Sequence, residues 1–248
     1  MTNSTLSMSY CAGDTLSRGH SALSMNTPEK TLILDVRRSR AMAATPRTIP
    51  GAVLAPDLAE IPKHAGLFRD ISKLRLFCVH GHERSISAAI LMRDFDCEVE
   101  DIPGGLEAFE EAGGETVSVV EGKTGVLGSS RLWLFDNTIE HAFVAWAMAR
   151  FIDPLSDYRF VPAAHRAKVQ IELESADANT TIFQEGGNPL NALLEEFDFQ
   201  NFPILTRTVI PFLQQPATSQ LLQGVSSEDV IAFCDHVWTL VHLKNQTL

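Results

Sequence analysis

The sequence predicts an α/β protein, with a mainly parallel sheet flanked by helices and then a second, mostly helical α+β unit. Between residues 31 and 112, short apolar runs alternate with stretches of helical periodicity, which is the pattern of βα units. The stretch 113–130 then carries five of the fifteen glycines and little helical pattern. Such a stretch favours a boundary between two units.

Four strands are expected in the first half. Residues 31–36 form a continuous apolar run, which is typical of a parallel strand buried on both faces. A turn at Pro50 and Gly51 precedes a short strand at 52–54. Two further strands are predicted at 74–77 and 98–102.

Helices are expected between and after these strands. The segment 85–95 has helical periodicity, and the residues predicted for its apolar side are Ile86, Ala89, Ile90 and Phe95. The fourth strand ends at Pro103, and a short helix is expected at 106–112.

The second half reads as mostly helical. Asn137 with Glu140 resembles a capping box, and the helix that it opens should end at Asp153 and Pro154. A strand is expected at 158–161. Ser226 with Asp229 opens a final helix, whose predicted apolar stripe is Val230, Phe233, Val237 and Val241.

The expected organisation is therefore an N-terminal extension (1–30) with one short helix, a first domain (31–118), a glycine-rich linker (119–130) and a second domain (131–248). Of the 248 residues, 45% are hydrophobic and 21% are charged, as in ordinary folded proteins. The net charge of −11 opposes any general attraction to nucleic acids or anionic membranes.

A cytoplasmic protein without cofactor or metal is expected. Residues 1–30 lack the basic and apolar segments of a signal peptide, and no apolar run approaches the ~20 residues that cross a bilayer. The four cysteines show neither C-x-x-C nor zinc-finger spacing. Cys11, Cys97 and Cys234 are interpreted as structural, and the oligomeric state is left open.

The most informative stretch follows the third expected strand. Cys78 ends that strand, a short loop follows, and a helix begins directly behind it. Loop amides and the free N–H groups of a helix start favour negative charge at one point, and Arg84 adds its own charge there. These effects lower a thiol pKa, and the thiolate is the nucleophile. The predicted anion-binding loop comprises Val79, His80, Gly81, His82, Glu83 and Ser85, with Cys78 and Arg84 as the catalytic pair.

The alternative for Cys78 is a buried structural cysteine, which is the commoner fate of a lone cysteine. Gly81 suits a loop that curls its backbone inward, and Arg84 suits an anion. Together with the helix directly behind the loop, these residues favour the reactive thiol.

Residues 31–112 resemble a rhodanese domain. The matching pieces, in the order of that family, are Asp35-Val36-Arg37, Ile49-Pro50-Gly51-Ala52, the Cys78 loop ending in Arg84-Ser85, and Gly104-Gly105-Leu106. The resemblance implies that Cys78 accepts a sulfane sulfur as a persulfide and passes it to a thiophilic acceptor. It implies a donor such as thiosulfate or a persulfide or thiol protein. Asp35 and Arg37 are expected to support the loop structurally.

Two departures keep other activities open. The family's usual histidine before Ile49 is Thr48 here, and the loop is C-x5-R rather than the C-x4-R of most sulfurtransferases. The longer spacing is that of rhodanese-fold cell-cycle phosphatases and arsenate reductases, in which the arginine can bind a tetrahedral oxyanion. His80, His82 and Glu83 are candidates for a general acid only by proximity. For the two histidines a loop-stabilising hydrogen bond is favoured. A non-catalytic anion-binding or regulatory protein is the third hypothesis.

The second half resembles the C-terminal domain of bacterial chromate-resistance proteins. The matching pieces include Trp146, the segments 150–154, 158–162 and 180–183, and the final helix around Trp238. The cysteines of that family are replaced here by other residues, such as Thr180 and Thr239. Any metal or redox role of those cysteines is therefore expected to be lost, which leaves a divergent domain that scaffolds or binds a partner.

Overall fold

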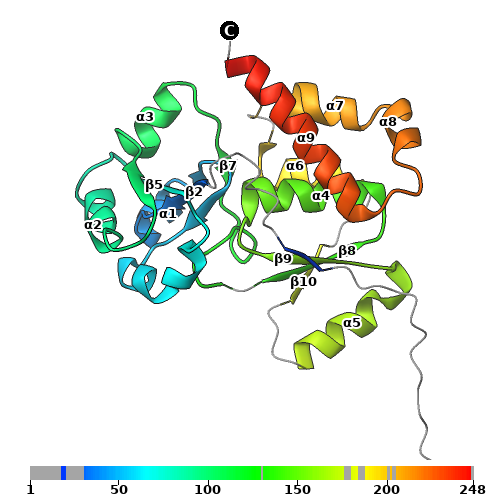
Figure 1. Ribbon diagram of the computed structural model, residues 1–248, viewed down its shortest axis with the longest axis horizontal. Coiled ribbons are helices and arrows are strands. Elements are labelled where there is room, and N and C mark those ends of the chain that lie inside the picture. Colours follow the sequence, from blue (N-terminus) through cyan, green and yellow to red (C-terminus); the bar gives the residue numbers. More distant parts are fainter. Residues whose placement is uncertain are drawn as a thin grey trace, which may run out of the picture.

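The computed structural model describes residues 18–20, 31–129, 131–175, 180–183, 188–199, 202 and 205–246. The strands are β1 (Arg18–His20), β2 (Thr31–Asp35), β3 (Arg47–Thr48), β4 (Ala52–Leu54), β5 (Lys73–Phe77), β6 (Glu98–Asp101), β7 (Val117–Ser118), β8 (Leu132–Asp136), β9 (Asp157–Val161) and β10 (Thr180–Ile182). The helices are α1 (Ser39–Ala44), the 3₁₀ segment η2 (Leu58–Phe68), α2 (Glu83–Leu91), α3 (Gly105–Glu111), α4 (Ile139–Ala147), the π-helical turns η3 (Met148–Ile152) and η5 (Leu205–Val209), α5 (Ala163–Ser175), α6 (Pro189–Glu196), α7 (Ile210–Leu213), α8 (Pro216–Leu221) and α9 (Ser227–Gln246). Figure 1 shows α1, α2 and α3 grouped around one sheet.

The first sheet has the strand order β4-β2-β5-β6, and every pairing in it is parallel. Successive strand residues alternate between its faces: Leu74 and Leu76 of β5 join the core with η2 and α2, whereas Phe77 packs with Leu106 of α3. Burial on both faces explains the continuous apolar runs in the sequence. The predicted α/β class, with a parallel sheet flanked by helices, is confirmed.

Helix α2 presents a different face to the core from the one predicted. Ile86 and Ile90 are 54% and 55% exposed, while Ser85, Ala88 and the following Met92 are buried. The helix must bring its first amides to the Cys78 loop, and this close approach turns small side chains inward. The prediction for Ile86 and Ile90 was therefore wrong.

The second sheet has the order β1-β9-β8-β10, in which β8 pairs in parallel with β9 and β10, and β1 is antiparallel to β9. Strand β8 was not predicted. Its Trp133 and Phe135 join a large aromatic core with Trp146 and Trp238. The predicted short helix in 1–30 lies outside the described residues, except for 18–20, which form strand β1.

Helix ends in the second half follow local capping. The N-cap of α4 is Thr138, not the predicted Asn137, because the Thr138 hydroxyl accepts a hydrogen bond from the amide of His141. At the start of α9, the Ser226 hydroxyl accepts from the Asp229 amide at 3.2 Å, as predicted. Within the described ranges, the helices are too short or too polar to cross a bilayer.

The predicted linker runs beside the edge strand β4. The Leu54 amide donates to the Gly125 carbonyl, and the Leu127 amide donates to the Leu54 carbonyl, at 2.9 and 2.8 Å. The Gly51 amide donates to Phe151 of η3 at 2.7 Å. The second half is thus hydrogen-bonded to the β4 edge of the first sheet.

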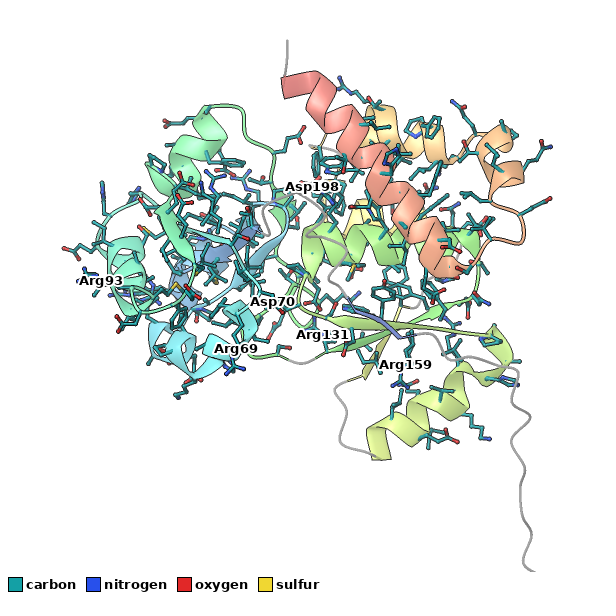
Figure 2. The ribbon with its side chains drawn as sticks, viewed as in Figure 1. Arg69, Asp70, Arg93, Arg131, Arg159 and Asp198 are labelled. Carbon is teal, nitrogen blue, oxygen red and sulfur yellow. The ribbon has the colours of Figure 1, made fainter. Side chains whose placement is uncertain are left out.

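A buried ion pair lies close to this junction. Arg131, which Figure 2 places near the centre of the molecule, donates to the Asp153 carboxylate at 2.8 Å. The Trp133 indole donates to the same carboxylate oxygen at 2.9 Å. Burial raises the pKa of Asp153, against the opposing effects of Trp133 and Arg131. The indole and guanidinium donors leave the buried carboxylate well hydrogen-bonded.

Candidate active site

Cys78 directly follows β5, at the carboxyl end of a central strand of the first sheet. Cys78 is only 7% exposed, yet it lines a cavity of about 750 Å³. Ligands of open α/β sheets bind at this end of the strands. The thiol therefore occupies the position from which the sheet can present a reactive group.

Hydrogen bonds converge on the Cys78 sulfur. The His82 amide donates to Sγ at 3.4 Å, and the Ser85 hydroxyl lies 3.7 Å from it. Burial raises the pKa of the thiol, but hydrogen bonds from His82, Ser85 and the His80 amide outweigh that effect and hold the pKa below its ordinary value. Because these groups favour the charged form, they prepare a thiolate.

The other cysteines behave in the opposite way. Burial raises the pKa of Cys97, with a further contribution from Asp96. Burial also raises the pKa of Cys234, which is fully buried. Cys11 lies outside the described residues. Among the three cysteines that the structure describes, Cys78 is the one with a lowered pKa.

The loop keeps its shape by packing against the start of α3. The amides of Leu106 and Glu107 donate to the carbonyls of Cys78 and Val79, at 2.9 and 3.2 Å. Gly81 has a φ of +66°, and a Cβ there would lie 2.6 Å from the Gly104 nitrogen. The left-handed backbone and the close contact with Gly104 both require glycine at position 81. The same backbone conformation turns the loop amides toward the Cys78 sulfur.

We predict that Ser85→Ala raises the Cys78 pKa. The substitution removes a hydroxyl that lies against Sγ and can stabilise the thiolate. The thiolate fraction at neutral pH falls, so the alkylation rate of Cys78 should reach half of its maximum at a higher pH. The measurement is the rate of iodoacetamide labelling of Cys78 against pH. Ser87→Ala is the control, because the Ser87 hydroxyl donates to the Glu83 carbonyl and lines the same cavity. An unchanged midpoint in Ser85→Ala contradicts the assignment.

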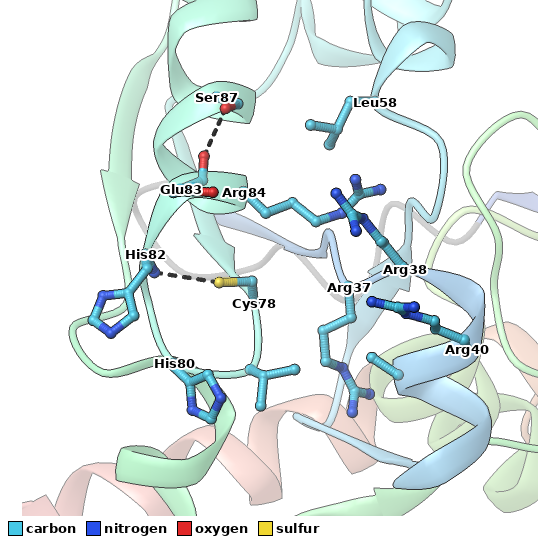
Figure 3. A pocket seen from close by; sticks show the side chains of 12 residues that line it. Arg37, Arg38, Arg40, Leu58, Cys78, His80, His82, Glu83, Arg84 and Ser87 are labelled. Atoms are coloured by element: carbon cyan, nitrogen blue, oxygen red, sulfur yellow. Dashed lines mark hydrogen bonds between the residues drawn. The ribbon is translucent and has the colours of Figure 1, made fainter.

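Arg84 lines the cavity, but two of its nitrogens are held by backbone. Its Nε donates to the Val36 carbonyl and its Nη2 to the Pro56 carbonyl. Figure 3 shows the side chain extending from α2 toward Arg38. Arg84 therefore joins the ends of β2 and β4 to α2, while its charge stays beside the cavity.

A buried ion pair lies next to the loop. Arg37 is 1% exposed and donates to both Asp35 oxygens, with contacts from 2.6 to 3.0 Å, and it also reaches the Thr45 carbonyl at 3.0 Å. The Thr48 hydroxyl donates to Asp35 at 3.0 Å. The pair thus joins the carboxyl end of β2 to the segment that follows α1.

The polar side chains of the loop, those of His80, His82 and Glu83, are exposed at the mouth of the cavity that they line. His80 Nδ1 lies 2.8 Å from a Glu107 oxygen, and both side chains are more than half exposed. His82 and Glu83 are exposed at the start of α2. The structure thus places a hydrogen bond on His80 that joins the loop to α3. Within the described residues, no group of three His, Cys, Asp or Glu side chains could hold a metal.

The cavity has a volume of about 750 Å³, and its described walls come entirely from residues 37–87. Figure 3 shows the Cys78 loop on one side and the arginines of the β2–α1 segment on the other. Sequence reasoning missed Arg38 and Arg40, which are exposed and line this cavity. Their position directly after the Asp35-Val36-Arg37 segment was the available signal, because residues that follow one central strand lie near those that follow the next.

Comparisons with known proteins give only partial matches. Neither a protein-family model nor a curated protein sequence matches the chain. Among solved structures, a rhodanese-related protein from Thermoplasma volcanium is 24% identical and matches 35% of this chain and 83% of its own, with a TM-score of 0.30. A Rhodanese_3 like domain from Anabaena sp. is 27% identical over 35% of this chain and 97% of its own, with a TM-score of 0.30.

A protein of unknown function from Rhodopseudomonas palustris, described as a possible tyrosine phosphatase, is 26% identical over 34% of this chain and 68% of its own, with a TM-score of 0.30. These matches leave more than half of the chain uncovered, and the chromate-resistance resemblance of the second half finds no support among them. The chain is thus similar, over about a third of its length, to two structures named as rhodanese-related or rhodanese-like and to one described as a possible tyrosine phosphatase.

Proposed function

We propose that the protein is a rhodanese-type sulfurtransferase that carries sulfane sulfur as a persulfide on Cys78. One observation carries this proposal: the Cys78 thiol has a lowered pKa, is surrounded by amide donors and opens into an arginine-lined cavity. Such a thiol is a ready nucleophile at neutral pH, and the cavity attracts anionic donors. A reducing compartment such as the cytoplasm keeps it available.

The transfer proceeds in two displacements. The Cys78 thiolate attacks the outer sulfur of thiosulfate; the new S–S bond forms as the old one breaks, and the electron pair leaves with sulfite. The terminal persulfide sulfur carries the negative charge, which the loop amides and Arg84 stabilise. A thiophilic acceptor such as cyanide then attacks the terminal sulfur, and the electron pair of the broken bond returns to Sγ as thiolate.

A cysteine phosphatase or arsenate-reductase-like activity is the second candidate, because the loop has the C-x5-R spacing. That chemistry needs the arginine to clamp a tetrahedral oxyanion with two nitrogens. Arg84 directs Nε and Nη2 to the carbonyls of Val36 and Pro56 instead. Sulfur transfer, which needs only the charge of Arg84 beside the cavity, therefore ranks first.

The test compares three reactions of the purified chain. Thiocyanate formation from thiosulfate and cyanide is expected, whereas hydrolysis of an aryl phosphate and thiol-dependent reduction of arsenate should stay at the uncatalysed rate. Phosphate release or arsenate reduction without thiocyanate formation would overturn the proposal in favour of oxyanion chemistry. If all three reactions fail, a non-catalytic anion-binding protein is the better account. The resemblance of the second half to chromate-resistance proteins finds no support in the comparisons, so no role in chromate or oxyanion stress is proposed.

A further inference from the structure

The rim of the Cys78 cavity carries unbalanced positive charge. Arg38 and Arg40 are exposed, and neither forms an ion pair with any described residue. Arg37 is neutralised by Asp35. Three arginines, Arg38, Arg40 and Arg84, therefore remain without a buried ion-pair partner among the described lining residues. Glu83 is the single carboxylate among those lining residues. On a chain of net charge −11, this is a local site for an anionic partner.

The guanidinium groups also lie close enough to repel each other. Burial lowers the pKa of Arg84 and the charge of Arg38 lowers it further, while Asp57 and the Cys78 thiolate act in the opposite direction. Figure 3 shows both side chains reaching over the same part of the cavity. A carboxylate placed between them would relieve this repulsion and could accept hydrogen bonds from both.

An exposed apolar strip continues from the cavity along α2. Ser87 lines the cavity, and Ile90 and Leu91 lie three and four residues further on, so they share its side of the helix one turn later. Ile90 is 55% exposed and Leu91 is 42% exposed. Large apolar side chains beside a charged cavity suit a partner that brings both carboxylates and apolar groups.

The cavity is also much larger than thiosulfate requires. Its volume of about 750 Å³ lies within the roughly 300–1,000 Å³ of pockets that hold drug-sized ligands. Its described walls come from the first half alone, so a polypeptide segment can approach without displacing the second half. The volume of the cavity, the positive charge of its rim and the apolar strip beside it all favour an anionic ligand of peptide size.

We propose that Arg38, Arg40, Ile90 and Leu91 form a docking surface for a cysteine-bearing, acidic segment of a partner protein, which exchanges sulfane sulfur with Cys78. This inference rests on the proposed persulfide chemistry of Cys78. The partner thiolate attacks the terminal sulfur of the Cys78 persulfide, and the electron pair of the broken S–S bond remains on Sγ. The terminal sulfur moves to the partner cysteine together with the negative charge that it carried on Cys78.

The test uses preloaded enzyme, whose persulfide is verified by mass, in single turnovers with short synthetic cysteine peptides of equal length. One peptide has Asp, Glu and Leu around the cysteine, a second has Asn and Gln in place of the acids, and a third has Ser in place of Leu. Each rate is divided by the rate of the same peptide with a small disulfide, which corrects for the reactivity of its thiol. The acidic Leu peptide should react about tenfold faster than the amide peptide, as expected for two partly exposed arginine–carboxylate contacts.

The variants connect this preference to the docking surface. In the double variant Arg38→Gln with Arg40→Gln, the rate with the acidic peptide divided by the rate with the amide peptide should fall close to one. The control is Arg207→Gln, which replaces an exposed arginine of η5 and should preserve the wild-type rate ratio. Leu91→Ser should reduce the preference for Leu over Ser peptides, while Leu221→Ser, at a position that is 75% exposed, should not.

Equal rates with the three peptides on a loaded, cyanide-reactive enzyme would overturn the docking surface and leave the sulfurtransferase proposal standing. A ratio that survives in the double arginine variant would likewise overturn it. Failure of Cys78 to load at all would instead refute the proposed function.

Discussion

Cys78→Ser should abolish sulfur transfer from thiosulfate to cyanide, with a loss on the order of a thousandfold or more. The serine hydroxyl has nearly the same shape, but it is far harder to ionise at neutral pH than a thiol whose pKa is held down by the His82 amide and Ser85. The measurement is the initial rate of thiocyanate formation at saturating cyanide.

Two comparisons make this result specific. Cys97→Ser should retain the wild-type rate, because Cys97 lies at the opposite, amino-terminal end of the parallel sheet, beside β6, and has a raised pKa. Cys78→Ser should also unfold at the same urea concentration as the wild type. Retention of more than a small fraction of the rate in folded Cys78→Ser would rule out the persulfide mechanism.

Asp35→Ala should destabilise the fold by about 3–5 kcal/mol, the cost of leaving a buried charge without its partner. Arg37 is 1% exposed and Asp35 is fully buried, so water cannot replace the lost carboxylate. The Thr48 hydroxyl loses its acceptor as well. Urea denaturation followed by circular dichroism measures the loss as a lower midpoint.

Two further variants separate charge from packing. The double variant Asp35→Leu with Arg37→Met removes both charges and should recover part of the stability, since an apolar pair leaves no isolated charge. Glu60→Ala breaks the exposed ion pair with Lys63 and should leave the midpoint unchanged. If Asp35→Ala unfolds at the wild-type midpoint, the pair does not stabilise the fold.

The sequence predicted the first sheet well because its strands are short, and β2, β4 and β5 are rich in apolar residues. The expected strands at 31–36, 52–54, 74–77 and 98–102 each lie within one residue of β2, β4, β5 and β6. The buried apolar residues of β2, β4 and β5 produce this signal without help from tertiary context, whereas β6 contains no buried residue. Strand β8 is equally apolar, but it precedes a long helical region, which concealed it.

The orientation of α2 could not be predicted from periodicity alone. Isoleucines at 86 and 90 have the spacing of a buried face, yet they point to solvent. Ser85 is buried because its hydroxyl lies 3.7 Å from the Cys78 sulfur and donates to the His82 carbonyl, so the side of α2 that carries Ser85 faces the loop. Tertiary constraint here overrides an apolar pattern.

The loop of the candidate site could be predicted from the sequence, but the other residues that line the cavity could not. Cys78 and its loop are contiguous in the chain, so their geometry follows from one strand–loop–helix unit. Arg38 and Arg40 reach the cavity from the segment after β2, and Arg84 finds carbonyl partners on Val36 and Pro56. Only the parallel pairing of β2 with β4 and β5 brings these parts together.

The central claim is tested most directly by the intact mass of the protein after incubation with thiosulfate. The account predicts the gain of one sulfur atom, mapped by peptide mass to Cys78 and removed by cyanide. Cys78→Ser treated in the same way should gain nothing. An unchanged mass in the wild type, or a cyanide-removable sulfur on Cys97 or Cys234 instead, would contradict the account.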